Sequence, residues 1–459
     1  MRDIDLLGLP FISGGRLQCL YYFVATVCQN QEAYMADMSH PDRLEEAARI
    51  WKESNIRDFL TKSAIAVGAG SATDAGLPWA LPSKDFKPIE LAGGIPDPAQ
   101  LPVDDLKESF RRVLESTPKE ALRYGGVPGF EGLREALAER QSRLEGLRLE
   151  PGNFIINNGG AGGIDNVCDA FVEPGDVVIV EAPTFSGSLR TIRGHMPEIV
   201  PVPVDDQGVL VERVAEELSR VEEAGKRAKL VYIIPDFHNP TGTTLSVERR
   251  ERLIEVCAAH KVLILEDTAY GEMYFGKEAP PSIYAMAQGQ GILKAATFSK
   301  IIATGLRIGW VQGREDYVES LVRVRFDMGN SPLLQRAIAD YMERGKLDPH
   351  VETMRSVYAE KCDVLCRSLE EHCRPYLRFK KPEGGFFLWA ECQGPSAKDI
   401  AKAATDEGLI FPTGANFFID GESNDTSHIR LAFITATLED LEQVGPRMRK
   451  AFQRALGER

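Results

Sequence analysis

The sequence has few cysteines for its length. Among 459 residues there are 8 cysteines, scattered and without a CxxC pair, at positions 19, 28, 168, 257, 362, 366, 373 and 392. A disulfide scaffold needs a denser pattern, so we expect reduced thiols and a cytoplasmic protein. Cys362, Cys366 and His372 raise a metal site as an alternative. Because Tyr358 and Leu369 join both cysteines on one apolar face of an expected helix, we interpret the cysteines as core and predict no metal site.

Long hydrophobic runs and an excess of positive charge are also absent. The stretch that most resembles a targeting signal, Cys19–Cys28, has ten residues, about half of what crosses a bilayer, and we interpret it as a buried or peripheral segment. The chain has 54 basic and 68 acidic residues, which gives a formal net charge of −14. Such a charge repels a phosphate backbone and an anionic lipid surface. We therefore predict neither a nucleic-acid partner nor a membrane partner.

Short apolar runs rich in Val and Ile alternate with helical patterns between about residues 150 and 315. Runs of this kind, mostly without polar alternation, indicate strands buried on both faces of a mainly parallel sheet that helices cover. The runs are Val177–Val180, Leu230–Ile234, Val262–Leu265, Ala295–Phe298 and Ile308–Val311. The pattern predicts an α/β fold in which the large domain has three layers.

The pattern changes to longer helices after about residue 316. We expect helices around Val351–Leu369, after Ser396 and near Leu438–Phe452, with strand-like pieces at 386–389 and 428–434. This arrangement predicts a smaller C-terminal α/β domain, and we place the boundaries at 1–88, 89–320 and 321–459. Residues 64–87 are rich in Gly, Ala, Ser and Pro and show no period, so we expect a long inserted loop there.

A lysine stands just after the expected strand Ala295–Phe298. Lys300 has hydroxyl side chains at Thr297 and Ser299 before it and Arg307 after it. A lone lysine at a strand end is usually a solvated residue that caps the sheet, so Lys300 needs support from other motifs. Two more strands supply it, because ligand sites of open parallel sheets gather at the carboxyl ends of the strands.

Those two strands end in further polar groups. The strand Val262–Leu265 leads to Asp267 and then to Tyr270, although an aspartate there could also cap a helix. The strand Leu230–Ile234 leads to Asn239, which stands in a turn that Pro240 and Gly242 fix. We expect the amide, the carboxylate and the lysine to lie near one another.

A glycine-rich turn opens a helix further upstream. Gly159-Gly160-Ala161-Gly162-Gly163 precedes an apolar stripe of helical period. Free backbone N–H groups and the positive end of the helix dipole at such a turn suit a phosphate. The pattern is not the GxGxxG of dinucleotide-binding folds, and the next strand ends in Glu181 followed by the motif that contains Phe185.

These groups together could hold a phosphorylated aromatic aldehyde. A lysine forms a Schiff base, a carboxylate pairs with a pyridinium nitrogen, and an amide and a phenol bind a ring oxygen. Backbone amides and an arginine bind the phosphate, and a phenylalanine stacks on the ring.

The sequence resembles the fold-type I pyridoxal-phosphate enzymes of aminotransferase class I/II over roughly residues 89–455. The motifs that carry the resemblance are Leu91-Ala-Gly-Gly-Ile-Pro, Tyr124-Gly-Gly-Val-Pro-Gly, Asn239-Pro-Thr-Gly, Asp267-Thr-Ala-Tyr, Ser299-Lys, Arg307, Pro382-Glu-Gly-Gly-Phe-Phe and Arg430-Leu-Ala-Phe. The Gly-Gly-Ile-Pro and Pro-Glu-Gly-Gly-Phe-Phe forms look most like the aminoadipate and kynurenine aminotransferase branch. The resemblance implies transfer of an amino group between an amino acid and a 2-oxo acid, with pyridoxal 5′-phosphate as cofactor.

The resemblance also implies a role for each matching residue. Lys300 would bind the cofactor covalently and move the proton, with Asp267 and Tyr270 as the other catalytic residues. The cofactor-binding residues would be Tyr124, Gly160, Ala161, Phe185, Asn239, Asp267, Ala269, Tyr270, Thr297, Ser299, Lys300 and Arg307. Gly94, Asn239 and Arg430 would bind the substrate. Because Tyr124 reaches the phosphate of the other subunit in the family, a homodimer with shared sites is expected.

This chain departs from its relatives in two places. Most relatives have a hydroxyl residue where it has Gly160 and an amide-bearing residue where it has Ala161, so the phosphate would depend on the helix terminus. The loop expected at 64–87 comes just before the segment that covers the substrate in relatives, and it could act as a lid over an unusual amino acid.

Two other functions stay open at this point. The same residues stabilise any carbanion at Cα, so elimination, replacement or cyclisation on an amino acid is the first alternative. The second is a transcriptional regulator built on an aminotransferase-like domain, which would need a basic recognition helix before the enzyme fold. Residues 1–88 contain an acidic stretch at 41–53 and no such helix that the pattern indicates.

Overall fold

The structure is a computed structural model that describes residues 40–68, 87–419, 421 and 424–457. Contacts divide the chain into two compact units, Met1–Ile65 and Ala66–Arg459. The apolar segment Cys19–Cys28 and residues 69–86 of the expected loop lie outside the described residues. None of the described helices has the length and apolar character needed to cross a membrane.

The first unit, as far as it is described, is helical. It contains α2 (His40–Glu53) and the short 3₁₀ turn η1 (Ile56–Phe59), and the rings of Trp51 and Phe59 lie 5.4 Å apart. Helix α3 (Lys62–Gly68) begins in this unit. The prediction of a loop from residue 64 was therefore wrong for residues 64–68, where Ala64 and Ala66 favour a helical turn.

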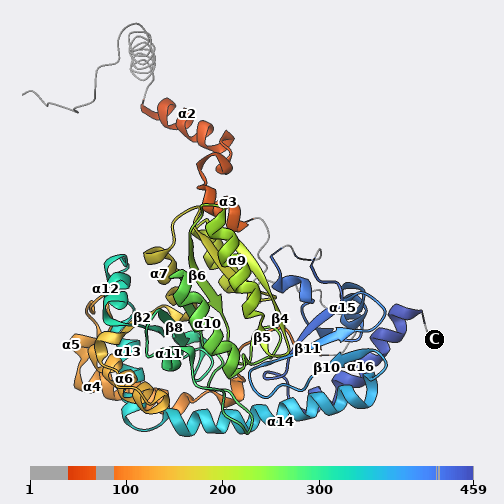
Figure 1. Cartoon of the computed structure of the whole chain (residues 1–459). Coiled ribbons are helices and arrows are strands. Elements are labelled where there is room, and N and C mark those ends of the chain that lie inside the picture. The colour runs from red at the N-terminus through yellow and green to blue at the C-terminus, as the bar shows by residue number, and fades with distance from the viewer. Residues whose placement is uncertain (1–39, 69–86, 420, 422–423, 458–459) are drawn as a thin grey trace, which may run out of the picture. The chain divides into compact units, whose positions relative to one another are not determined.

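An eight-stranded sheet forms the centre of the second unit (Figure 1). Its strand order is β2-β9-β8-β7-β6-β3-β4-β5, and β9 and β5 run against the others. The strands are β2 (Phe154–Asn157), β3 (Val177–Ala182), β4 (Glu198–Asp205), β5 (Gly208–Val209), β6 (Ala228–Ile233), β7 (Leu263–Asp267), β8 (Ile292–Thr297) and β9 (Gly309–Gln312). The prediction of a mainly parallel sheet is confirmed.

Helices bury both faces of this sheet. Neighbouring residues along a strand enter different cores, as Ile264 and Leu265 of β7 do. One face packs against α6 (Glu131–Glu145), α9 (Val211–Glu223) and α10 (Val247–His260), and the other packs against α7 (Gly159–Phe171), α8 (Ser186–Gly194) and α12 (Glu315–Arg323). Ser246 caps the start of α10, since its side chain accepts a hydrogen bond from the Arg249 amide. The three layers explain why these strands have no polar alternation.

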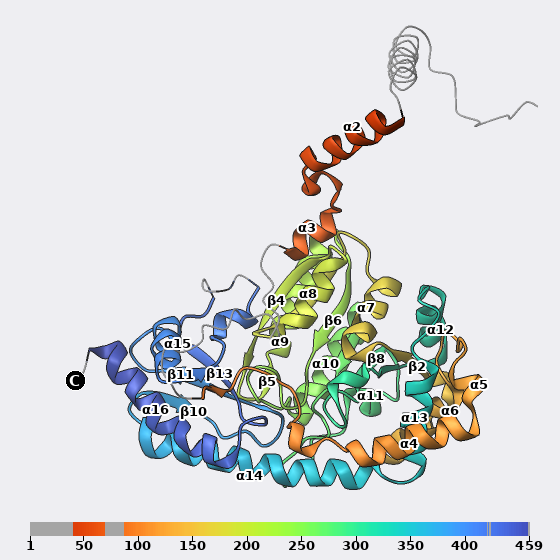
Figure 2. The same cartoon turned by 180° about the vertical axis from the view of Figure 1, so that it is seen from behind.

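A smaller antiparallel sheet follows in the C-terminal part. It consists of β10 (Leu377–Phe379), β11 (Phe387–Cys392) and β13 (His428–Ala432), and α15 (Ala397–Asp406) and α16 (Leu438–Leu456) accompany it. Helix α14 (Leu347–Cys373) runs beneath both sheets (Figures 1 and 2). The remaining α-helices are α4 (Val103–Ser116), α5 (Pro118–Ala121), α11 (Ile283–Met286) and α13 (Pro332–Glu343).

The cysteines of α14 belong to the core, as the helical pattern predicted. Tyr358, Cys362, Cys366 and Leu369 are all buried. The helix packs closely on α16, where the Ser368 hydroxyl donates a hydrogen bond to the Glu442 carbonyl at 2.7 Å. The face that carries the cysteines packs elsewhere in the core, since Cys362 Sγ lies 3.9 Å from the Pro382 carbonyl and the Tyr358 ring lies 5.4 Å from that of Phe386.

A two-stranded parallel pair joins segments that are far apart in the sequence. β1 (Ile89–Glu90) pairs with β12 (Leu409–Ile410), so Ile89 lies opposite Leu409. The pair fixes the start of the segment 89–97, which we call the strap. Because each strand has only two residues, the periodicity of the sequence did not predict it.

Candidate active site

Five of the predicted motifs follow the carboxyl ends of five strands that run in the same direction. Gly159 follows β2, Phe185 follows β3, Asn239 follows β6, Asp267 ends β7, and Lys300 follows β8. All of these ends lie on one edge of the eight-stranded sheet. The structure therefore brings together residues that lie far apart in the sequence, from Gly159 to Lys300.

Two groups of residues make up the site. We call Lys300, Asp267, Asn239, Tyr270 and Arg430 the lysine cluster, and Gly159, Gly160, Ala161, Thr297, Ser299 and Arg307 the glycine cluster. Both include residues at the carboxyl edge of the sheet, and the backbone of β8 connects them through Thr297.

Lys300 reaches the strap. Its Nζ donates a hydrogen bond to the Gly94 carbonyl at 2.7 Å and lies 5.8 Å from the centre of the Tyr270 ring. A Cβ at Gly94 would lie 2.7 Å from Cζ of Phe387, so only glycine lets the strap pass this close to the aromatic ring. The strap thus places a backbone carbonyl directly over the amine.

Contacts from the C-terminal part hold the strap along its length. The Leu91 amide donates to the Ile410 carbonyl at 2.8 Å, and the Thr435 hydroxyl donates to the Ile95 carbonyl at 3.2 Å. At its end, Asp97 pairs with the buried Lys361 at 2.6 Å. These anchors keep Gly94 next to Lys300.

Asp267 is buried at the end of β7. Its Oδ2 accepts a hydrogen bond from the Tyr232 hydroxyl at 2.8 Å, and its Oδ1 accepts one from the Ala269 amide at 3.2 Å. Burial raises the pKa of Asp267, whereas these two donors and the charge of Lys300 act in the opposite direction. The carboxylate therefore depends on its donors to stay ionised.

Arg430 and Asn239 form a second buried contact. The Arg430 Nη1 donates to Oδ1 of Asn239 at 2.8 Å, and its Nη2 donates to the Ala92 carbonyl at 2.5 Å. The guanidinium lies 4.1 Å from the ring centre of Phe387 and 4.6 Å from that of Phe417. Nδ2 of Asn239 is buried and has no hydrogen-bond partner among the described residues, so it is placed to donate to a ligand.

Helix α7 starts within the glycine cluster. Gly159 has a φ of +70°, and a Cβ there would lie 2.7 Å from Nη2 of Arg307. A Cβ at Gly160 would lie 3.8 Å from Cβ of Thr297, which is ordinary contact. Thr297 Oγ1 lies 2.9 Å from Ser299 Oγ. The cluster offers backbone N–H groups, two hydroxyls and one guanidinium, a donor set suited to an anion.

Three predicted residues stand apart from these contacts. Tyr124 is 84% exposed on a loop. Phe185 is half-buried and packs against Gly187, while Ala269 is half-buried and contributes its amide to Asp267.

Sequence reasoning missed two residues beside Asp267. Tyr232 is fully buried on β6, and Ser188, in the first turn of α8, lies 2.8 Å from its hydroxyl. The available signal was a phenol within an otherwise apolar strand, because a buried hydroxyl needs a partner.

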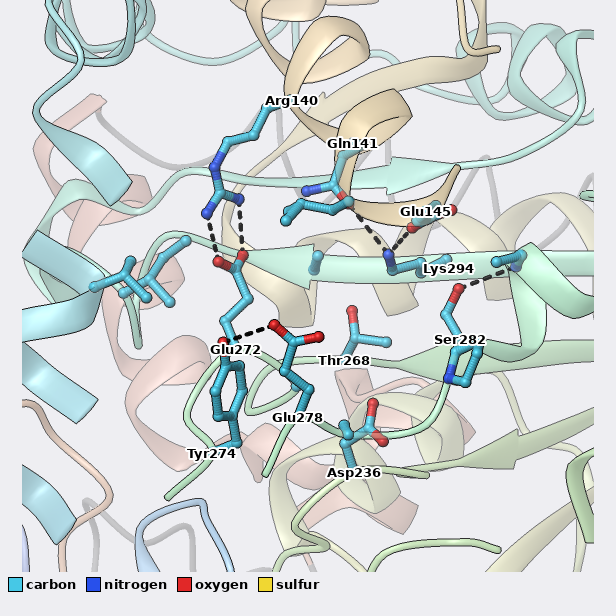
Figure 3. Close-up of a pocket in the computed structure, with 18 of the residues that line it drawn as sticks. Arg140, Gln141, Glu145, Asp236, Thr268, Glu272, Tyr274, Glu278, Ser282 and Lys294 are labelled. Atoms are coloured by element: carbon cyan, nitrogen blue, oxygen red, sulfur yellow. Dashed lines mark hydrogen bonds and ion pairs between the residues drawn. The ribbon is translucent and has the colours of Figure 1, made fainter. Parts of the chain in front are cut away.

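A cavity of about 790 Å³ adjoins the site through Ala269 (Figure 3). Figure 3 shows that Arg140 turns toward Glu272 and Lys294 toward Glu145. Arg140 binds Glu272 with Nη1 at 2.9 Å, and Lys294 pairs with Glu145. Since these charges compensate one another, we assign the cavity no ligand.

Comparison with known proteins gives a clear family match. The sequence pattern described as "Aminotransferase class I and II" matches residues 87–445. The aromatic-amino-acid aminotransferase 1 of Thermococcus litoralis is 33% identical over 75% of this chain and 84% of its own length. The 2-aminoadipate transaminase of Thermus thermophilus is 28% identical over 80% of this chain and 90% of its own length.

The fold matches solved structures as well. A multiple substrate aminotransferase from Thermococcus profundus superimposes with a TM-score of 0.81 at 29% identity, covering 88% of this chain and all of that one.

Proposed function

The chain belongs to the class I and II aminotransferases, a family that depends on pyridoxal phosphate, and we propose that its lysine and glycine clusters hold this cofactor. Amino-group transfer between an amino acid and a 2-oxo acid is the activity of the family. The single observation that carries the proposal is the convergence of Asn239, Asp267 and Lys300 at the ends of three neighbouring strands.

The residues fit the cofactor at both of its ends. Nδ2 of Asn239 is a buried donor without a partner among the described residues, which suits a ring oxygen. The start of α7, with Thr297, Ser299 and Arg307 beside it, suits the phosphate. When bound, the cofactor supplies a carbonyl carbon that reacts with amines and an aromatic ring that accepts electrons from the substrate Cα.

Lys300 is the proposed proton carrier. Its amine lies against the Gly94 carbonyl of the strap and near the Tyr270 ring. From there it would take the proton from the substrate Cα and return it to the neighbouring cofactor carbon. The strap would keep water from this exchange.

Asp267 would hold a proton on the ring nitrogen by pairing with it. A buried carboxylate stabilises a nearby positive charge more strongly than an exposed one, because water does not screen it. Asn239 and Tyr270 would bind the ring oxygen, and Phe185 and Ala269 would cover the two faces of the ring. These roles rest on the positions of the strands and on the family resemblance.

Arg430 is the proposed site for the substrate carboxylate. Its guanidinium is fully buried and held by Asn239, Ala92 and two aromatic rings. This fixed fork matches a carboxylate in a bidentate arrangement. Gly94 would contact the substrate through its backbone.

A second copy of this chain is the proposed partner. Leu122, Tyr124, Phe326 and Met328 are between 53% and 87% exposed. The two loops that carry them lie together, since a Cβ at Gly329 would approach the Gly126 carbonyl to 2.7 Å. An apolar patch of this kind is typical of a subunit interface, and we propose that Tyr124 reaches the partner's phosphate site.

A cytoplasmic location and a domain boundary near residue 320 also remain our proposals.

The experiment that tests the function is a single-turnover assay. The protein loaded with pyridoxal phosphate is mixed with a panel of amino acids, including aromatic ones and 2-aminoadipate, and the cofactor released on denaturation is quantified. Conversion to pyridoxamine phosphate in wild type, with none in Lys300→Ala, is expected. Ammonia release without pyridoxamine phosphate would contradict the proposal and favour elimination. Failure of wild type to bind the cofactor would overturn the assignment of the site.

A further inference from the structure

Asp267 lies where a negative charge is difficult to maintain. The residue is only 8% exposed, and burial raises its pKa. A second buried carboxylate, Glu181, also opposes its ionisation. Lys300 is the cation that acts against this, but the proposed function requires its amine to react. Other groups must therefore help to keep Asp267 charged.

Tyr232 is the side chain that donates to Asp267. The two residues lie on the neighbouring strands β6 and β7, whose register places Tyr232 opposite Leu265. The Tyr232 hydroxyl lies 2.8 Å from Oδ2 of Asp267 and 2.8 Å from Oγ of Ser188. All three residues are buried, so water does not compete for these hydrogen bonds.

The proton count fixes the direction of this chain of hydrogen bonds. A phenol has one proton, and a carboxylate only accepts. If Tyr232 gives its proton to Asp267, its oxygen is left to accept the proton of Ser188. The order Ser188 to Tyr232 to Asp267 satisfies each group and polarises the phenol toward the carboxylate.

Asp267 keeps room for one more donor. A carboxylate has about four lone-pair positions, and the structure records two donors to Asp267, the Tyr232 hydroxyl and the Ala269 amide. A protonated ring nitrogen would occupy one of the positions that remain. The phenol therefore does not compete with the cofactor.

We propose that Tyr232, supported by Ser188, is a positioning residue that holds Asp267 as an oriented anion so that the cofactor ring nitrogen keeps its proton. This inference rests on the proposed function, because it concerns the partner of a ring that the chain must bind. Without the phenol, the shared proton would move from the ring nitrogen toward the carboxylate. The ring would then accept electrons from the substrate less well.

The test compares three variants loaded with ¹⁵N-labelled pyridoxal phosphate. Tyr232→Phe removes the hydroxyl and keeps the ring, and Ser188→Ala removes the supporting donor. Tyr341→Phe is the matched control, because Tyr341 is also fully buried and its hydroxyl has no partner among the described residues. The readouts are the ¹⁵N resonance of the ring nitrogen at neutral pH, kcat, and thermal unfolding as a check of the fold.

The decisive readout is the ¹⁵N resonance of the ring nitrogen. Tyr232→Phe should move the ring nitrogen signal toward the unprotonated position and lower kcat by about tenfold or more, as loss of a hydrogen bond to a charged group does. Ser188→Ala should have a smaller effect in the same direction, and Tyr341→Phe should have none. An unchanged resonance in Tyr232→Phe, with or without a loss of kcat, would overturn the inference. A wild type that shows no bound cofactor signal would instead refute the proposed function.

Discussion

The lysine cluster and the glycine cluster hold their proposed ligand groups in opposite ways. In the lysine cluster, the donors and acceptors are side chains from four separate segments, and they already have partners: Arg430 binds Asn239, and Asp267 accepts a hydrogen bond from Tyr232 of β6. In the glycine cluster, the helix backbone supplies most donors, and Arg307 is exposed with its guanidinium on the Asn158 carbonyl at 3.3 Å.

This difference predicts which substitutions affect catalysis and which affect cofactor affinity. A buried side chain that already has a partner leaves that partner unsatisfied when it is removed. A backbone donor survives most substitutions, and a site made of glycines can gain donors. We therefore expect large losses of catalysis in the lysine cluster and small changes of cofactor affinity, in either direction, in the glycine cluster.

The largest effect is expected from Lys300→Ala. Removal of the amine eliminates both the attachment of the cofactor and the proton carrier, so amino transfer should fall by at least about 10²–10⁴-fold. Steady-state kinetics with the best amino donor measures the loss. The exposed lysine variant Lys381→Ala is the control and should keep its rate. A Lys300→Ala protein that transfers amino groups at a tenth of the wild-type rate would refute the role.

Asp267→Asn should have the next largest effect. It should lower kcat by about 10²–10³-fold, as loss of one preorganised electrostatic group does. The amide has similar size, so thermal unfolding should change little. Glu266→Gln is the matched control, because Glu266 is the preceding carboxylate on the same strand and accepts hydrogen bonds from the amides of Ile283 and Tyr284. Equal losses of kcat in both variants would contradict the assignment.

A further prediction concerns how the stability difference between wild type and Glu266→Gln depends on pH. Burial raises the pKa of Glu266 to about 7 from its usual 4.5. The folded state therefore favours the protonated form, and wild type should lose stability relative to Glu266→Gln as pH rises from 4.5 to 7. Chemical denaturation at several pH values measures this difference, and a constant difference across that range would contradict it.

Arg430→Lys should affect the substrate rather than the cofactor. Lysine keeps the charge but lacks the planar fork, so KM for the amino acid should rise about 10–100-fold. Equilibrium binding of pyridoxal phosphate should change by less than about threefold, because the proposed partner of Arg430 is the substrate carboxylate and not the cofactor. Comparable loss in both measurements would remove its proposed role.

Gly160→Ser is expected to have the smallest effect, and it should strengthen cofactor binding rather than weaken it. The space beside Thr297 accepts a Cβ, and a new hydroxyl should lower the Kd of pyridoxal phosphate by about 2–10-fold. Gly160→Ala fills the same space without a donor and should show no gain. Gly159→Ala should weaken binding, because its φ of +70° and the approach of Arg307 leave no place for a methyl group. If Gly160→Ala gained as much as Gly160→Ser, the argument from donors would be wrong.

Much of the site was predictable because it depends on strand order alone. Asn239, Asp267 and Lys300 each follow an apolar run, and parallel strands place such residues on one edge. The glycine-rich start of α7 was predictable for a similar reason, since its motif is contiguous.

The remainder depends on contacts between distant segments. Tyr232 looked like an apolar strand residue until the register of β6 and β7 placed its hydroxyl on Asp267. The strap comes before the strands of the large sheet in the sequence, whereas Lys361, which pairs with Asp97 of the strap, comes after them. No local periodicity records such a pairing, and the same holds for the two-residue strands β1 and β12.

The most direct measurement locates the cofactor on the chain. The protein loaded with pyridoxal phosphate is reduced with borohydride, digested with trypsin and sequenced by mass spectrometry. The account predicts the reduced cofactor on Lys300, within a peptide from Ala295 to Arg307 whose cleavage at Lys300 is blocked. Cofactor on another lysine with Lys300 unmodified, or no attached cofactor, would contradict it.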